Sequence, residues 1–176
     1  MNTILQQELK KILNGRFSQS ESTRLNYSRG EDTYDPILSK AVVFPETNEE
    51  VSKILKLCNK HKVPVVPYGT GTSLEGNVVG NDKGITISLE KMNKILTVNT
   101  QDFDCRVQAC VTREQLNDYL REDGIFFPID PGANAAIGGM TSTSASGTMA
   151  VKYGTMKTVV TGLTVVLPNG EIMNTG

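Results

Sequence analysis

The sequence predicts a fold that mixes helices and strands, and three observations lead to this prediction. A strand at residues 41–44, a helix that follows Thr47 and a strand at 63–67 form a β-α-β unit. Residues 85–89 and 105–109 alternate apolar and polar side chains, which is typical of half-buried strands. Glycines divide the chain: two occur in the first 68 residues, five between 69 and 84, and nine from Gly124 onward.

The elements before this unit are predicted from spacing and polarity. Residues 3–13 carry apolar side chains near helical spacing, and the polar stretch that continues to Lys40 predicts an irregular arm. Ala41–Phe44 is a strand that Pro45 ends. Thr47 and Glu50 then form a capping box, in which each side chain bonds the backbone N–H of the other.

The later elements follow the same rules. Thr112 and Gln115 repeat the capping-box pattern for a second helix, and Gly124 suits the left-handed position after it. Residues 159–167 are strand-like, and Asn169-Gly170 predicts a hairpin turn into the residues that follow.

Composition excludes several classes of protein. Lys plus Arg total 18 against 19 Asp plus Glu over 176 residues, so no basic field favours nucleic-acid binding. No apolar run approaches the roughly 20 residues of a spanning helix, which predicts a soluble protein. Residues 1–13 mix acidic and amide side chains with apolar ones, unlike a secretion or transit signal, so we expect a cytoplasmic location.

Cysteine and histidine are too few for a metal centre or a conventional triad. Cys58, Cys105 and Cys110 are an odd, scattered set that we interpret as small buried residues. The single histidine, His61, lies where a helix should end and is interpreted as a helix cap. We therefore predict no metal site, and no motif in this chain places a catalytic residue.

Two segments have compositions unlike ordinary connectors. The first, Pro67–Gly76, follows a strand and has three glycines and three hydroxyls, so its amides and hydroxyls could converge on a phosphate; an ordinary glycine-rich turn is the alternative. It lacks the Gly-Lys-Ser/Thr of a Walker A loop, which predicts phosphate binding without phosphate transfer.

The second segment is Asp130–Gly147. Residues 131–151 contain no charge, and 15 of these 21 residues are Gly, Ala, Ser or Thr. Composition leaves a flexible linker, a membrane segment and a ligand-binding surface open, although the hydroxyls argue against a membrane segment. On a ligand-binding surface the hydroxyls would act as donors, and Gly139, like Gly71, would adopt positive φ.

Nine segments, in order, carry a resemblance to a known family. They are Val42–Val51, Pro67–Gly76, Ser88–Leu96, Val111–Leu116, Asp130–Gly132, Ile137–Met140, Ala145–Thr148, Tyr153–Lys157 and Val165–Gly170. Through them the chain resembles the FAD-linked oxidases of the vanillyl-alcohol oxidase type, and within these the D-lactate dehydrogenase and glycolate oxidase group.

The resemblance implies an α+β FAD-binding domain of the PCMH type, with a β-α-β lobe followed by a mixed-sheet lobe. Residues 1–40 would be a helix and arm, 41–99 the first lobe and 100–176 an incomplete second lobe, with FAD between the lobes. The implied FAD-binding residues are Pro67, Tyr68, Gly69, Thr70, Gly71, Thr72, Ser73, Gly76, Pro131, Gly132, Gly138, Gly139, Ser142, Thr143, Gly147, Tyr153 and Gly154. Covalently flavinylated relatives offer a histidine where Thr72 stands, which implies non-covalent FAD.

The resemblance also implies a function for a longer protein, of which this chain would be an N-terminal fragment. That protein would oxidise a 2-hydroxy acid, D-lactate or glycolate, to the 2-oxo acid, whereas the fragment alone would be inactive. Another oxidase or synthase of the superfamily and a non-catalytic module for a phosphorylated ligand are the alternatives. We expect the fragment to self-associate through exposed strands, and peripheral membrane attachment of the longer protein stays open.

Overall fold

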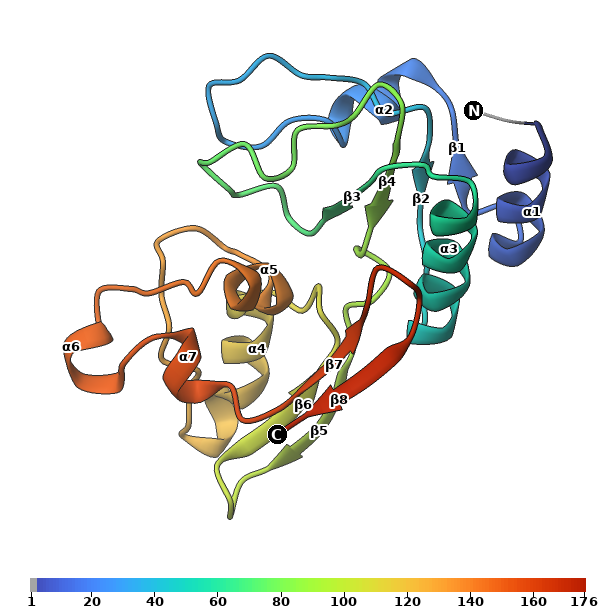
Figure 1. The fold of residues 1–176 in the computed structure, drawn as a ribbon. Coiled ribbons are helices and arrows are strands. Elements are labelled where there is room, and N and C mark those ends of the chain that lie inside the picture. The colour runs from blue at the N-terminus through green and yellow to red at the C-terminus, as the bar shows by residue number, and fades with distance from the viewer. Residues whose placement is uncertain (1–2) are drawn as a thin grey trace. The chain divides into compact units, whose positions relative to one another are not determined.

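The computed structural model describes residues 3–176, which form two compact units (Figure 1). Unit 1 comprises the chain up to Lys91 together with Gly162–Gly176, and unit 2 comprises Met92–Thr161. These boundaries differ from the predicted lobes, because the N-terminal helix and the C-terminal hairpin both pack on the same helix of the predicted β-α-β unit.

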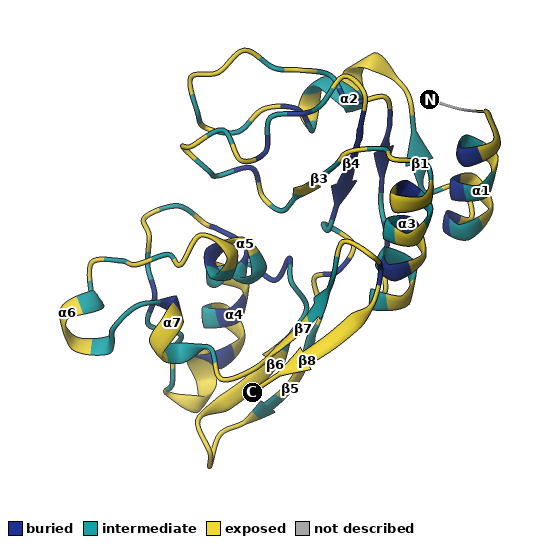
Figure 2. Cartoon of the chain, in the orientation of Figure 1, coloured by how far each residue is buried: buried dark blue, intermediate teal, exposed yellow. Residues whose placement is uncertain are grey.

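Unit 1 contains a four-stranded sheet in the order β1-β2-β4-β3. Its strands are β1 (Phe17–Ser18), β2 (Val42–Val43), β3 (Val65–Tyr68) and β4 (Ile85–Ser88). Both β2 and β3 run parallel to β4, which confirms the predicted β-α-β unit. All four residues of β4 are buried, as Figure 2 shows, because both faces of this strand are covered: Ile85 and Ile87 belong to the core cluster, and Thr86 Oγ1 bonds Ser39 Oγ at 2.9 Å.

The helices of unit 1 are α1 (Thr3–Leu13), α2 (Glu21–Asn26) and α3 (Asn48–Lys60). Leu5, Leu9 and Leu13 recur at intervals of four, so one face of α1 is fully buried, in one cluster with Ile54 of α3. Burying each such side chain stabilises the fold by roughly 1.5–3 kcal/mol. The predicted helix at 3–13 is confirmed.

The ends of α3 show which polar groups position it. Thr47 Oγ1 accepts a hydrogen bond from the Glu50 N–H at 3.2 Å, as predicted. The Glu50 carboxylate reaches beyond this box, because it accepts from the Glu46 N–H at 2.7 Å and pairs with Arg16 at 2.5 and 2.8 Å. His61 is the residue that ends α3, as predicted, and its Nε2 lies 3.8 Å from Glu8 Oε2 of α1.

The prediction of an irregular arm before Lys40 is partly wrong. The arm contains β1, which pairs antiparallel with β2, and α2, whose first turn is capped by the side chain of Ser20. A two-residue strand and a six-residue helix carry too few apolar residues for periodicity to reveal them. Neighbouring strands and caps determine their structure.

Unit 2 has one hairpin, β5 (Ile95–Asn99) with β6 (Asp104–Val107), and several short helices. The helices are α4 (Arg113–Leu120), the 3₁₀ turn η1 (Arg121–Asp123), α5 (Ile137–Ser142), α6 (Ala150–Tyr153) and α7 (Met156–Val159). The side chain of Thr112 caps α4 as predicted, but the side chain of Gln115 donates to the Asn93 carbonyl. Gly124 is left-handed at φ +69°, also as predicted.

The C-terminal hairpin of unit 1 consists of β7 (Leu163–Val166) and β8 (Ile172–Thr175). The turn is confirmed, but the strand begins later than predicted because α7 continues to Val159. The Gly170 N–H bonds the Leu167 carbonyl at 2.7 Å with φ +82°, a conformation that suits glycine. Ser52 of α3 donates to the Gly170 carbonyl and so attaches the turn to the helix.

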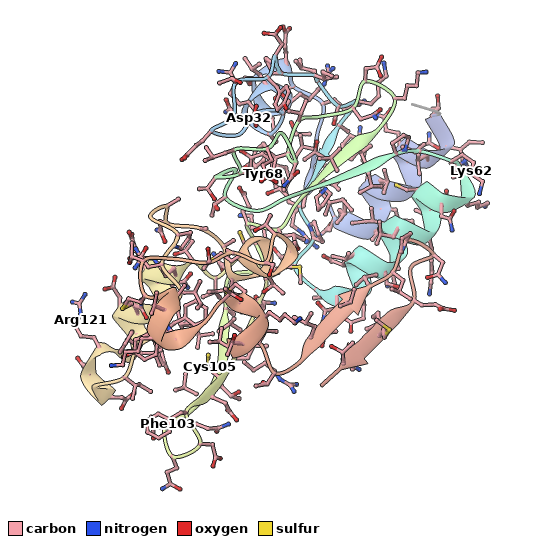
Figure 3. The ribbon with its side chains drawn as sticks, turned by 60° about the vertical axis from the view of Figure 1, so that its left-hand side comes forward. Asp32, Lys62, Tyr68, Phe103, Cys105 and Arg121 are labelled. Carbon is pink, nitrogen blue, oxygen red and sulfur yellow. The ribbon has the colours of Figure 1, made fainter. Side chains whose placement is uncertain are left out.

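The cysteine prediction holds for two of the three residues. Cys58 and Cys110 are buried, whereas Cys105, labelled in Figure 3, is exposed on β6 of the two-stranded sheet. Residues 3–176 contain no cluster of three His, Cys, Asp or Glu side chains arranged to hold a metal ion. Within the same range, no helix is both long and apolar enough to span a bilayer.

Candidate functional site

The first candidate site is the loop of residues 69–76, which continues from the carboxyl end of β3. Parallel strands present their following loops at this edge of a sheet, where ligands commonly bind. Pro67 and Tyr68 end β3, and Gly71 is buried with φ +75°. This left-handed conformation confirms the expectation for Gly71.

Tyr68 lies under this loop. Its hydroxyl donates to the Arg29 carbonyl at 3.0 Å, and its ring meets that of Tyr27 edge-on at 5.1 Å. Burial raises the pKa of the Tyr68 hydroxyl, so it stays protonated at neutral pH and remains a donor. The Tyr68 side chain is thus used to support the loop, and its donor is directed to protein.

A segment that the sequence placed in the arm covers one side of the loop. The Glu31 N–H donates to the Gly71 carbonyl at 3.1 Å, and a Cβ on Gly76 would lie 2.7 Å from the ring of Tyr34. Figure 3 labels Tyr68 and Asp32, which lie in this region of unit 1. The sequence does not point to Tyr27, Glu31 and Tyr34, since these residues lie about 40 residues before the loop and no local pattern links the two segments.

Three of the remaining side chains of the loop are hydroxyls, and the other two are Leu74 and Glu75. Thr70 Oγ1 and Thr72 Oγ1 lie 3.4 Å apart, and Ser73 Oγ accepts from the Glu75 N–H at 3.4 Å. Glu75 is the only charged side chain between residues 67 and 76, and it is exposed. A phosphate would therefore meet backbone amides and hydroxyls here, with no lysine or arginine in the loop.

The second candidate site, in unit 2, begins at Pro131 and Gly132, which are both exposed. Asp130 fixes this turn: its Oδ1 accepts from the Gly132 N–H at 3.0 Å and faces Arg113 Nε at 3.5 Å. The first turn of α4 is also bonded to the segment, through the Arg113 N–H to the Ala135 carbonyl at 3.0 Å. The segment is ordered by these contacts, which argues against a flexible linker.

Two glycines of the second segment are required by packing. A Cβ on Gly138 would lie 2.8 Å from the Cβ of Ala109, and one on Gly147 would overlap the backbone of Asp130. Gly139 differs, because it is exposed and a Cβ there would meet nothing within 4 Å. The expected positive φ at Gly139 is wrong, since this residue belongs to α5.

The hydroxyls of α5 are not directed outward as donors. Ser142 Oγ donates to the Gly138 carbonyl at 2.9 Å, and Thr143 Oγ1 donates to the Gly139 carbonyl at 3.2 Å. Ser and Thr side chains in or at the end of a helix can bond the carbonyl one turn earlier, and both do so here. For Ser142 and Thr143 the expectation of donor hydroxyls is therefore corrected, because their hydrogens are used within the protein and these two side chains offer oxygen lone pairs.

Tyr153 and Gly154 complete the predicted set in unit 2. The Tyr153 ring packs edge-on against Phe126 at 5.6 Å, and Lys152 Nζ lies 4.8 Å from the Tyr153 ring centre. Gly154 ends α6, where a Cβ would lie 2.8 Å from the Cβ of Thr158. Each unit thus gathers its own part of the predicted site residues.

This mixed fold and its two glycine-rich segments define the class of protein. A family described as FAD binding domain matches residues 39–176, and the chain belongs to that family. Among curated proteins, the chain is 45% identical over 158 residues to a probable mitochondrial D-lactate dehydrogenase of Danio rerio, covering 90% of this chain and 32% of that protein. The chain is 34% identical to the glycolate oxidase subunit GlcD of Bacillus subtilis, and the match covers 91% of this chain and 34% of that protein.

Solved structures support the predicted PCMH-type fold. An alkyldihydroxyacetonephosphate synthase superposes with a TM-score of 0.90 at 21% identity, over 100% of this chain and 35% of that one. A p-cresol methylhydroxylase superposes with a TM-score of 0.81 at 25% identity, over 98% of this chain and 35% of that one. Helices and strands are thus combined here as in the FAD-binding domain that the sequence resembles.

The chain spans about a third of the length of the curated relatives it matches. Several of these relatives, including one from Arabidopsis thaliana that is 42% identical over 96% of this chain and 30% of its own length, are named as mitochondrial. The expected cytoplasmic location is not supported by these names and stays a prediction.

Proposed function

We propose that this chain forms the FAD-binding part of a flavoprotein dehydrogenase that oxidises a 2-hydroxy acid, D-lactate or glycolate, to the 2-oxo acid. The observation that carries the proposal is the 45% identity, over nine-tenths of the chain, to a protein named as a D-lactate dehydrogenase. Bound FAD would supply the hydride acceptor, and the residues described here would bind and orient it.

The chemistry of the loops fits the diphosphate of FAD. In unit 1 the Gly71 carbonyl is bonded to the Glu31 N–H and is thereby directed toward the protein, while the residues Thr72 and Ser73 are half-buried. In unit 2 the exposed Gly132 and Gly139 let a ligand approach the backbone closely. The predicted set of site residues remains our proposal for the cofactor site.

Non-covalent attachment is part of the proposal. A covalent link needs a nucleophile that reaches the flavin, and neither segment contains His or Cys. Tyr68 is the one tyrosine of the first loop, and its hydroxyl is bonded to the Arg29 carbonyl with a raised pKa. His61 ends α3 and faces Glu8 of α1, on elements that the proposed site does not include.

Binding of FAD is tested by titrating the purified chain with FAD and following flavin fluorescence. We expect saturable quenching, and all flavin should pass a filter after the protein is denatured. Flavin retained by the denatured polypeptide would refute the non-covalent proposal, and a chain that never quenches FAD would refute cofactor binding.

The substrate class needs a separate experiment. Anaerobic addition of D-lactate or glycolate to a longer polypeptide that contains this chain should bleach bound FAD, whereas the chain alone should leave it oxidised because we place no proton-accepting residue in it. Bleaching only by an unrelated substrate would favour another oxidase or a synthase. The fold similarity to the synthase, at 21% identity, does not favour that activity over the first.

We also propose that the isolated chain self-associates. All four residues of β8 are exposed, among them Ile172 and Met173, and a two-stranded sheet has unpaired backbone groups along its edges. Light scattering should give a mass that rises with protein concentration. A constant monomer mass would contradict the proposal.

A further inference from the structure

We infer that Tyr68 and the segment of residues 27–31 position the first glycine loop, so that the N–H of Thr72 is presented to an anionic group of the ligand. The inference rests on the proposed function for the identity of that group, the diphosphate of FAD. This segment precedes residue 39, where the match to the FAD-binding family begins. Part of the support for the loop thus comes from outside the matched domain.

The first step is the orientation of one peptide unit. The Glu31 N–H donates to the Gly71 carbonyl at 3.1 Å, which directs that carbonyl toward the segment. A trans peptide is planar, so its C=O and its N–H point in opposite directions. The N–H of Thr72 therefore points away from the segment, and the carbonyl that would repel an anion is turned back into the protein.

The second step is the support under Gly71. A Cβ on Gly71 would overlap the Tyr68 hydroxyl, so the backbone rests directly on this side chain. The same hydroxyl donates to the Arg29 carbonyl at 3.0 Å. The phenol thus joins the loop to residue 29 in the middle of the segment, while the Glu31 N–H joins the loop to the C-terminal end of the segment.

The third step is the packing of Tyr27 against the Tyr68 ring, which fixes the position of Tyr68. Tyr27 packs edge-on against the Tyr68 ring at 5.1 Å and against Phe44 at 5.4 Å. The Tyr27 hydroxyl donates to the Glu90 carboxylate, and burial raises the Tyr27 pKa, so this bond persists at neutral pH. The loop, the segment and the residues after β4 thus form one connected contact set. Tyr68 is in this sense a positioning residue.

Two pairs of variants test the inference. Tyr68→Phe removes only the hydroxyl, and Tyr119→Phe is its control because Tyr119 is exposed on α4 in unit 2. Glu31→Pro removes the N–H that bonds Gly71, and Glu31→Ala is its control because it keeps that N–H. Amide hydrogen exchange of residues 69–76 without FAD, the Kd for FAD and the thermal midpoint are measured for all four.

Tyr68→Phe and Glu31→Pro should each speed exchange in this loop about tenfold and raise the Kd for FAD about tenfold, as expected for one lost hydrogen bond. Both controls should match the wild type. A merely structural role would instead lower the thermal midpoint and speed exchange throughout unit 1. If either Tyr68→Phe or Glu31→Pro fails to fold, the other variant and its control test the positioning role.

The outcomes separate the two proposals. Faster exchange confined to the loop, in a chain that binds no FAD, would support the positioning role and refute the proposed cofactor. Loop exchange equal to that of the controls would overturn the positioning role even where FAD binds. Normal FAD affinity despite faster exchange would overturn the presentation of the Thr72 N–H.

Discussion

Gly147 lies directly against the backbone of Asp130, so closely that a Cβ on Gly147 would overlap the Asp130 carbonyl oxygen. The neighbouring residue extends this contact, because the Thr148 N–H donates to the same carbonyl at 3.3 Å. Both ends of the second glycine-rich segment therefore meet at Asp130, and this contact closes the segment into a loop.

The first prediction follows from this contact. Gly147→Ala should lower the free energy of unfolding by about 3 kcal/mol, because backbone atoms cannot move aside as a flexible side chain can. Urea denaturation measures this change. Gly139→Ala is the matched control: it has open space around its Cβ and should raise stability by roughly 0.5–1 kcal/mol, as for Ala in place of Gly within a helix.

The same control tests the cofactor site without disturbing the fold. We expect Gly139→Ala to bind FAD more weakly, since its methyl group would occupy the space through which a ligand approaches. A stable Gly139→Ala chain with unchanged FAD affinity would remove this residue from the proposed site. Gly147→Ala of unchanged stability would contradict the close contact with Asp130.

The second prediction concerns Asp130 itself. Its carboxylate accepts from the Gly132 N–H and faces Arg113, so Asp130→Asn should keep the first contact and lose the second. We expect Asp130→Asn to lower the free energy of unfolding by about 0.5 kcal/mol, because the pair with Arg113 is partly exposed. Asp130→Ala should lower it by about 1–2 kcal/mol, because the bond to the Gly132 N–H is lost as well. Equal effects in urea denaturation would show that the Gly132 bond contributes nothing.

The third prediction is a pH dependence. The Glu50 carboxylate accepts a hydrogen bond from the Arg16 guanidinium, and this bond lowers the pKa of Glu50 below its usual 4.5. A lowered carboxyl pKa stabilises the fold above the unfolded-state value, and this stabilisation is lost as the pH falls through the folded-state pKa. Glu50→Gln should therefore cost about 1–3 kcal/mol at pH 7 and much less near pH 3.

Urea denaturation of the wild type and of Glu50→Gln at several pH values measures this difference in the free energy of unfolding. Glu49→Gln is a suitable control because Glu49 is exposed in the same first turn of α3. A cost of Glu50→Gln that stays constant from pH 7 to pH 3 would contradict the role of the Arg16 pair.

The fourth prediction concerns the thiols. Cys105 is exposed on β6, whereas Cys58 and Cys110 are buried. Burial raises the pKa of Cys58 to about 11, and desolvation and Asp104 also raise the pKa of Cys105, so access to the reagent decides the order of labelling. A thiol reagent should therefore label Cys105 first, and the other two only when the chain unfolds. Mass spectrometry after proteolysis identifies the labelled site, with Cys105→Ser as the control. Early labelling of Cys58 would contradict the packing of α1 on α3.

Much of the fold was predictable because its determinants are local. The apolar spacing of residues 3–13, the Thr47 and Thr112 caps and the turn at Gly170 act over a few residues, and the structure confirms each. The predicted left-handed Gly71 is likewise local, since glycine has no Cβ and adopts positive φ without steric cost. Family resemblance, which depends on the order of such motifs, was accordingly reliable.

Other features depend on residues that are far apart in the chain. The sequence alone determined that residues 67–76 and 130–147 are unusual, but only the tertiary structure decided what their residues do. Gly138 and Gly147 are glycines because other backbone or side-chain atoms lie against them, and the hydroxyl of Tyr68 supports the loop through Arg29. Such contacts are set by packing, which a one-dimensional pattern does not encode.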